Sequence, residues 1–340
     1  MRRAGALIAG ALVATLAVPM LIGGRVVLAQ TLSFPVSGYL ALLSVIAMCW
    51  IARALKLQLL MSRLDLRPGF ARIFAISLAT DFAFISTPGG VGGYAASIYY
   101  IRREGVSISA ATTITAADQL LDLAFFALAL PLAGLTLVSS ELPAALTVLA
   151  FGASALMIAV GAGALLGRRK ILAWLVNDNL LTRRRPGLRR RQQTLHEFLS
   201  SVGAHMRLLP GGGLVNLLAL AGTTAVQWVT RYGALWVVLR LLGHNVPFAL
   251  TLLLQSLVLH AAMWTGVPSG GGGAELGLSA TLAPWVPMTS MATALLLWRM
   301  TTFYVCLVVG AVAISLLAQQ SPRLPKINAI DPNATGEGVG

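Results

Sequence analysis

The sequence predicts an all-α integral membrane protein with about six transmembrane helices and two re-entrant helical hairpins of opposite orientation. Composition is the first reason, because 57% of the 340 residues are hydrophobic, 11% are charged and the mean hydropathy is +0.81. Soluble domains carry about 25% charged residues. Several apolar runs also reach the roughly 20 residues that cross a bilayer. Finally, two further apolar segments are interrupted by glycine clusters that each follow a proline.

Six apolar runs are predicted to span the membrane. They lie at about 5–22, 38–57, 107–137, 143–166, 213–242 and 291–317. The first run follows a basic start and is expected to be a retained span, with a cleaved signal peptide within residues 1–29 as the alternative. Residues 1–317 are therefore treated as a single polytopic membrane domain. The polar tail 318–340, rich in proline and glycine, is expected to be disordered.

The net charge of +14 is concentrated in short segments between the apolar runs. Ten of the 25 Lys and Arg residues lie in the stretch 168–207, and smaller clusters lie at 53–72 and at Arg102 and Arg103. Short basic loops mark the cytoplasmic side of a membrane protein. We therefore expect a multi-pass protein of the cell (inner, cytoplasmic) membrane, with loop 168–207 and the C-terminus in the cytoplasm. This distribution argues against a nucleic-acid partner.

The first glycine cluster lies in "FISTPGGVGGYAASIYYIRREG", residues 84–105. The helix that follows, 91–101, would be about 16 Å long, which is too short for a hydrocarbon core of about 30 Å. Because segment 69–101 begins and ends at basic residues, we expect it to enter and leave by the cytoplasmic face. Its tip is "PGGVGG", where proline ends one helix and glycine allows the turn.

The second cluster lies in "WTGVPSGGGGAELGLSATLAP", residues 264–284, and interrupts segment 248–284. The helix after it is again too short to cross. Following the spans in order from the cytoplasmic Arg103, this segment begins outside, so the second hairpin is expected to dip into the membrane from the opposite face.

The two hairpins belong to an internal repeat. Pro88 and Pro268 lie 180 residues apart (268 − 88). The same offset relates Gly90, Gly92 and Gly93 to Gly270, Gly272 and Gly273, and Gln119 to Arg299. Repeat 1, about 38–137, and repeat 2, about 213–317, would then have inverted topology, which is typical of transporters. The alternative is two unrelated loop-forming glycine clusters.

Irregular backbone at membrane depth must be buried in protein or line a polar cavity. The helix N-termini after the two tips would point amide groups and a positive dipole end into that cavity, which suits an anionic group such as phosphate. The residues predicted to contact the substrate are Gly89, Gly90, Gly92, Gly93, Gly270, Gly271, Gly272, Gly273, Glu275, Arg299 and Gln119.

Other polar residues inside the apolar segments need partners, because charges within spans are costly. Asp118 and Asp122 share one helix face; together with Asp81 and His260 they are candidates either for ion coupling or for structural hydrogen bonds. Arg299 would pair with Asp118, Asp122 or Glu275, or would hold a substrate phosphate. A packing role is favoured for Gln227 and Arg231.

No catalytic, metal or cofactor site is predicted. Cys49 and Cys306 both lie inside apolar runs, which favours core cysteines over a disulfide or a metal site. Neither glycine cluster is followed by the Lys-Ser/Thr pair of a P-loop, so ATP is not expected to drive the protein directly. We predict that the protein is not an enzyme.

Three stretches, "STPGGVGGYAASIYYIRREGVSISAATTITAADQLLD", "VPSGGGGAELGLSATLAP" and "WRMTTFY", resemble the flippase-like transmembrane region of lysylphosphatidylglycerol synthases, from about residue 40 to 317. The resemblance implies a lipid translocase for an anionic phospholipid, an aminoacylated lipid or a polyprenyl-phosphate-type glycolipid. The family usually has arginine at the position of Gln119, in a pattern like "DRLLD". The chain also stops without the soluble domain of the bifunctional members, so it should be a stand-alone member and not a synthase.

The function expected from these observations is a lipid flippase whose midplane cavity, between the two tips, passes the headgroup while the acyl chains stay in the bilayer. Two alternatives stay open: a secondary carrier of a soluble anion, and a membrane scaffold or accessory subunit of a lipid- or glycan-modifying system. Membrane lipids with anionic headgroups are the expected partners. A second copy of the chain and a lipid-modifying enzyme are further candidates.

Overall fold

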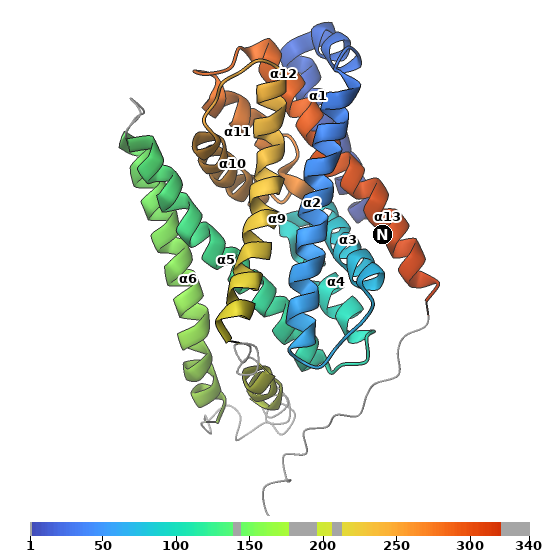
Figure 1. Cartoon of the computed structure of the whole chain (residues 1–340), viewed down its shortest axis with the longest axis vertical. Helices are drawn as coiled ribbons and strands as arrows, with labels where there is room; N and C mark the ends of the chain where they lie inside the picture. Colours follow the sequence, from blue (N-terminus) through green and yellow to red (C-terminus); the bar gives the residue numbers. More distant parts are fainter. Residues whose placement is uncertain (1, 139–143, 177–195, 206–212, 321–340) are drawn as a thin grey trace, which may run out of the picture.

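The computed structural model describes residues 2–138, 144–176, 196–205 and 213–320, and in these ranges all regular structure is helical (Figure 1). The predicted all-α class is confirmed. Residues 196–205 are helical as well. The other elements are α1 (Arg2–Leu32), α2 (Val36–Ser62), α3 (Phe70–Ser86), η1 (Pro88–Gly90), α4 (Val91–Arg102), α5 (Ile108–Val138), α6 (Ala144–Val176), α9 (Gly213–Leu241), α10 (Phe248–Met263), η2 (Pro268–Gly270), α11 (Gly273–Leu282), α12 (Met288–Arg299), the π-helical η3 (Met300–Tyr304) and α13 (Val305–Ala318).

Five helices in the described part of the chain are long and apolar enough to cross a membrane. They are Gly10–Leu32, Val36–Ser62, Ile108–Leu137, Gly213–Leu241 and the α12–α13 unit Met288–Ala318. Each corresponds to a predicted span. The sixth predicted span, 143–166, falls in α6, whose apolar part Val148–Gly163 is shorter.

Helices α2 and α9 lie side by side at the centre of the molecule (Figure 1). Around this pair lie two segments that are each broken by a short turn: the first broken segment is α3, η1 and α4, and the second is α10, η2 and α11. Helix α3 of the first packs against α13, at the end of the second half of the chain. Helix α10 of the second packs against α5, at the end of the first half. Helix α6 packs mainly on α5, at the edge of the bundle. This arrangement leaves the interior bounded by the two broken segments.

Helix α1 is an integral part of the bundle. It packs along α12, and its Ala11, Thr15 and Val27 are buried. The Thr15 hydroxyl lies 2.6 Å from the Tyr304 hydroxyl, which also donates a hydrogen bond to the carbonyl of Leu12. These hydrogen bonds join α1 to Tyr304 in η3.

The described parts of the basic region 168–207 are helical. Helix α6 continues through Val176, and residues 196–205 form another helix. The apolar stretch "ILAWLV" after the first basic run has no proline or glycine to end the helix. Residues 177–195 and 206–207 of this region, and the tail from residue 321, lie outside the described residues.

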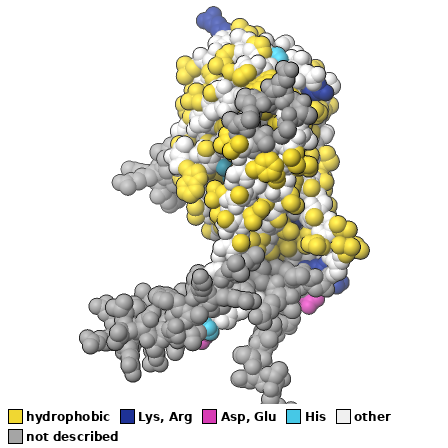
Figure 2. All heavy atoms as spheres, turned by 90° about the vertical axis from the view of Figure 1, so that its left-hand side faces the viewer, with side chains coloured by type: hydrophobic (Ala, Val, Ile, Leu, Met, Phe, Trp, Pro, Cys, Tyr) yellow, Lys and Arg dark blue, Asp and Glu magenta, His cyan; other side chains and the backbone are white. Residues whose placement is uncertain are grey.

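The surface is apolar where a bilayer would contact it. Figure 2 shows the face formed by α5 and α6, covered mainly by hydrophobic side chains, with charged side chains chiefly near its two ends. Leu128 and Leu132 of α5 are 74% and 63% exposed, and water would not favour so much exposed apolar area. The chain is therefore a multi-pass membrane protein.

Candidate functional site

The two broken segments have the same local build. In each, a helix is followed by a 3-10 turn that begins at a proline: η1 begins at Pro88 after α3, and η2 begins at Pro268 after α10. The two residues after each proline have positive φ: 59° and 72° at Gly89 and Gly90, and 54° and 62° at Ser269 and Gly270. The turns η1 and η2 pack against each other inside the bundle. Two tips far apart in the sequence thus meet in the interior.

Each tip already contains an acceptor for one of its own amide groups. Gly92 donates its backbone N–H to the Thr87 hydroxyl at 2.9 Å, and Gly272 donates to a carboxylate oxygen of Glu275 at 2.8 Å. Gly92 and Gly272 occupy equivalent positions in the repeat predicted from the sequence. These interactions cap the helices α4 and α11 from within the protein.

A cavity of about 710 Å³ lies beside the tips. Its polar wall is contributed by Arg53, Asp81, Gln119, Asp122, Trp228, Arg231, Tyr232, Gln255, His260, Ser269, Arg299 and Thr302. Its apolar wall includes Leu120, Leu123, Phe126, Met157, Val160, Val202, Leu259 and Met263. Cavities of this volume accept drug-sized or larger ligands. One compartment therefore offers both charged and apolar surfaces.

Asp81 of α3 is the centre of one charged group. Arg53 of α2 pairs with one of its carboxylate oxygens, and the Nη1 of Arg231 lies 3.5 Å from the other. The Arg231 pair is the longest of the ion pairs among the described residues, and the Arg231 side chain is 21% exposed at the cavity. Of the cavity's guanidinium groups, that of Arg231 has the longest ion pair and belongs to the most exposed side chain.

Lys56 of α2 is the centre of a second charged group. Its ammonium is fully buried and lies 2.6 Å from both Asp118 and Asp122 of α5. Asp122 also accepts a hydrogen bond of 2.7 Å from the indole N–H of Trp228, and Asp118 accepts one of 3.2 Å from Gln119. A charge in an apolar interior is stable only when it is paired in this way.

Arg299 is fixed to the second tip. Its Nε lies 2.5 Å from Glu275, and its Nη1 donates to the Ser269 hydroxyl at 3.0 Å and toward the Ser269 carbonyl at 3.3 Å. Trp298 and Phe303 flank the guanidinium, at 4.6 and 5.7 Å from their ring centroids. The Arg299 side chain is 2% exposed, so most of its donors are already engaged.

The predicted site residues divide between the cavity wall and its supports. Gly89, Gly90, Gln119, Arg299, Asp81, Asp122 and His260 line the cavity. The remaining residues do not line it: the glycines form the tips, Glu275 pairs with Arg299 and Asp118 accepts a hydrogen bond from Gln119; these residues are Gly92, Gly93, Gly270, Gly271, Gly272, Gly273, Glu275 and Asp118. Of the partners considered for Arg299, the structure selects Glu275.

Sequence reasoning missed Arg53 and Lys56, which it assigned to a cytoplasmic basic cluster at 53–72. Both instead lie within the apolar helix α2, where Lys56 is fully buried. The sequence did contain a signal. Arg53 and Lys56 are three residues apart, so they share one face of a helix. The next basic residue, Arg63, lies seven positions beyond Lys56, which separates the pair from the rest of the cluster. Arg231 was assigned to packing, whereas it lines the cavity.

Two comparisons with known proteins bear on this arrangement. A relative named UPF0104 membrane protein, from Archaeoglobus fulgidus, is 23% identical over 290 residues, which cover 78% of this chain and 82% of the relative. The family of the lysylphosphatidylglycerol synthase transmembrane region matches residues 5–310, which include the broken segments and the cavity. The chain therefore belongs to the family of the lysylphosphatidylglycerol synthase transmembrane region.

Proposed function

We propose that this protein translocates an amphiphile with an anionic headgroup between the two leaflets of the cell membrane. The observation that carries the proposal is the mixed wall of the cavity, because guanidinium groups and apolar side chains line a single compartment of about 710 Å³. A soluble anion would need only the polar wall, and a scaffold would need neither. The family membership agrees with a lipid-related role.

The two broken segments are proposed to be re-entrant hairpins that enter from opposite faces and belong to inverted repeats. The contacts support this proposal, because α3 packs on α13 as α10 packs on α5, and the central α2–α9 pair joins the two halves. In such repeats, broken helices meet near the membrane midplane and bound the substrate site. The end that carries Arg102 and Arg103 is then cytoplasmic.

Arg231 is proposed to be the principal contact of the headgroup. Its ion pair with Asp81 is long, its side chain is 21% exposed and it faces the cavity. A phosphate oxygen would replace this weak pair with a charge-assisted hydrogen bond. The apolar wall at Met157 and Leu259 would hold the acyl chains. No chemical step is assigned to the protein.

The test is a leaflet-accessibility assay on the purified protein in phosphatidylcholine vesicles that contain headgroup-labelled phosphatidylglycerol. Wild-type protein should equilibrate the probe between leaflets, and Arg231→Gln should slow it about tenfold or more, because a hydrogen bond to a charged group contributes roughly 1.5–3 kcal/mol. Arg240→Gln is the matched control, because Arg240 lies on the same helix but is exposed and contacts Asn245. A wild-type protein that moves no labelled lipid would refute the translocase and favour the scaffold or soluble-anion reading.

A further inference from the structure

The charges around the cavity balance to zero when all of them are ionised. Apart from the pair of Arg72 and Glu104, the ion pairs in the described part of the chain join four basic side chains, Arg53, Lys56, Arg231 and Arg299, to four acidic ones, Asp81, Asp118, Asp122 and Glu275. An anionic headgroup in this cavity would therefore add one uncompensated negative charge. Uncompensated charge in a poorly solvated site is costly, so binding favours the uptake of one positive charge.

The excess of negative charge lies at Lys56. One ammonium there serves two carboxylates, those of Asp118 and Asp122, at 2.6 Å each. The group around Asp81 has the opposite imbalance, because two guanidinium groups serve one carboxylate. A proton that enters the cavity is thus stabilised most by a carboxylate of the Lys56 group.

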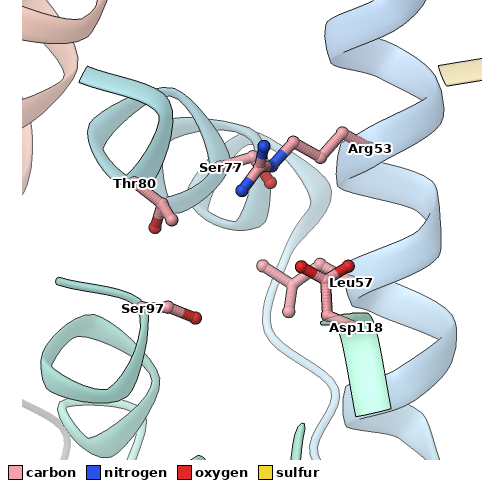
Figure 3. Close-up of a pocket in the computed structure, with 6 residues that line it drawn as sticks. All are labelled: Arg53, Leu57, Ser77, Thr80, Ser97 and Asp118. Carbon is pink, nitrogen blue, oxygen red and sulfur yellow. The ribbon is translucent and has the colours of Figure 1, made fainter. Parts of the chain in front are cut away.

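The two carboxylates of this group face different compartments. Asp122 lines the large cavity, whereas Asp118 lines a hollow of about 10 Å³ with Arg53, Leu57, Ser77, Thr80 and Ser97 (Figure 3). Lys56, itself fully buried, joins the two. Asp122 is therefore the carboxylate of this group that is exposed to the charge of a headgroup in the cavity.

The hollow has the size and chemistry of a site for one water molecule. A water needs about 10–15 Å³ and two to four polar partners. The hydroxyls of Ser77 and Thr80 have no hydrogen-bond partner among the described residues, although these two residues are only 2% and 4% exposed. Figure 3 shows the side chains of Thr80, Ser97 and Asp118 around this hollow, which Arg53 and Ser77 also line. A water here would give Asp118 a proton-exchange partner on the side away from the large cavity.

We propose that the protein carries one proton with each anionic headgroup and that Asp122 binds this proton. The inference rests on the proposed translocation and adds its energy source. When the headgroup enters, a hydronium in the cavity transfers its proton to a carboxylate oxygen of Asp122; an O–H bond forms there and a water molecule remains. Lys56 stays ionised on Asp118. The cavity then carries one positive charge against the headgroup's negative charge, and the proton returns to water when the headgroup leaves.

Other groups that face the Lys56 group are less suited to this role. They are Arg53 on α2, Asp81 on α3, Tyr94 on α4, Gln119 on α5, and Trp228 and Arg231 on α9. The guanidinium groups stay protonated, and Asp81 is held between two of them. His260 on α10 also lines the cavity and is the competing proton acceptor, so it enters the test.

The experiment applies a pH difference of about one unit across vesicles that contain the full-length protein and labelled phosphatidylglycerol, with the membrane potential held at zero. One-to-one coupling should concentrate the probe up to about tenfold in the leaflet on the alkaline side, because one pH unit corresponds to a tenfold ratio. Asp122→Asn should reduce this steady-state ratio to one. The ratio does not depend on the rate, so a slower variant still reports on coupling.

His260→Gln and Asp65→Asn should keep the ratio of the wild type. Asp65 is an exposed residue in the turn between α2 and α3 that does not line the cavity, and its φ of 56° suits asparagine. A wild-type protein that equilibrates the probe but leaves equal leaflets under the pH difference would overturn proton coupling and leave translocation standing. Loss of the ratio in His260→Gln with its retention in Asp122→Asn would overturn the assignment to Asp122. Absence of any probe movement would overturn both proposals.

Discussion

At the scale of single residues, the two tips differ in a coordinated way. Ser269, Glu275 and Arg299 of the second tip occupy the positions of Gly89, Ala95 and Gln119 of the first, each 180 residues earlier. Ser269 has the left-handed φ of 54° that its counterpart Gly89 adopts without strain. Its hydroxyl and carbonyl both accept from Arg299, which stabilises this backbone. The first tip thus has neither the arginine nor the acid and serine that hold it in the second tip.

Removing Glu275 alone should leave Arg299 buried without a counter-charge. We expect Glu275→Leu to lower the free energy of unfolding by about 3–5 kcal/mol, and the double change Glu275→Leu with Arg299→Met to recover most of that loss, because a buried pair can often be replaced by apolar groups. Chemical denaturation in detergent measures both. Equal stability of the single and the double variant would contradict a buried pair whose members depend on each other.

At the scale of elements, the glycines of the first tip serve two different purposes. Gly89 and Gly90 allow the positive φ of η1, whereas Gly93 allows α4 to approach α3, since a Cβ there would overlap the ring of Phe84. The pairs Gly89–Gly90 and Gly92–Gly93 look alike in the sequence. The structure shows that the first pair is needed for the backbone of the turn, whereas Gly93 is needed for the packing of two helices.

Gly93→Ala should therefore destabilise the first broken segment. Phe84 would have to move, and such overpacking costs about 1–3 kcal/mol. Gly152→Ala in α6 is the control: nothing lies within 4 Å of its added Cβ, so the change should stabilise the helix by roughly 0.5–1 kcal/mol. Thermal unfolding of the two variants compares them directly, and a Gly93→Ala protein as stable as the Gly152→Ala protein would disprove the close approach.

At the scale of the whole molecule, the apolar wall of the cavity depends on α6, which packs mainly on α5. Met157→Trp would fill the acyl-chain side of the cavity and should slow lipid equilibration about tenfold without loss of stability. Leu156→Trp is the control, because Leu156 is 66% exposed and does not line the cavity. The leaflet assay measures both, and equal rates would remove α6 from the transport route.

Much of the fold could be predicted from the sequence, because apolar length, proline and glycine act locally. Five helices fall where apolar runs predict them, and the turns η1 and η2 begin at the two prolines. The charged groups of the site could not be predicted, because their partners are distant: Lys56 and Asp122 are 66 residues apart. A local basic cluster is also ambiguous, since Arg53 and Lys56 look like loop residues until α3 and α5 supply their acids.

The orientation of the whole molecule gives the last prediction. Between Ser107, before α5, and Asn245, after α9, the chain passes through α5, α6 and α9. If all three cross the membrane, the two positions lie on opposite sides, with Ser107 in the cytoplasm because it follows Arg102 and Arg103. Both residues are exposed, whereas the native Cys49 and Cys306 are buried. Single cysteines at the two positions can therefore be labelled against a silent background.

A membrane-impermeant maleimide added to intact cells should label Asn245→Cys and should reach Ser107→Cys only after the cells are broken. Three crossings bring the chain to the opposite side of the membrane, whereas two crossings return it to the side where it began. Labelling of both positions from one side would therefore mean that α6 does not cross. The two hairpins would then begin on the same face, and their opposite orientation, on which the inverted repeat depends, would be lost. Labelling of Ser107→Cys alone in intact cells would keep the three crossings but reverse the orientation that the basic residues predict.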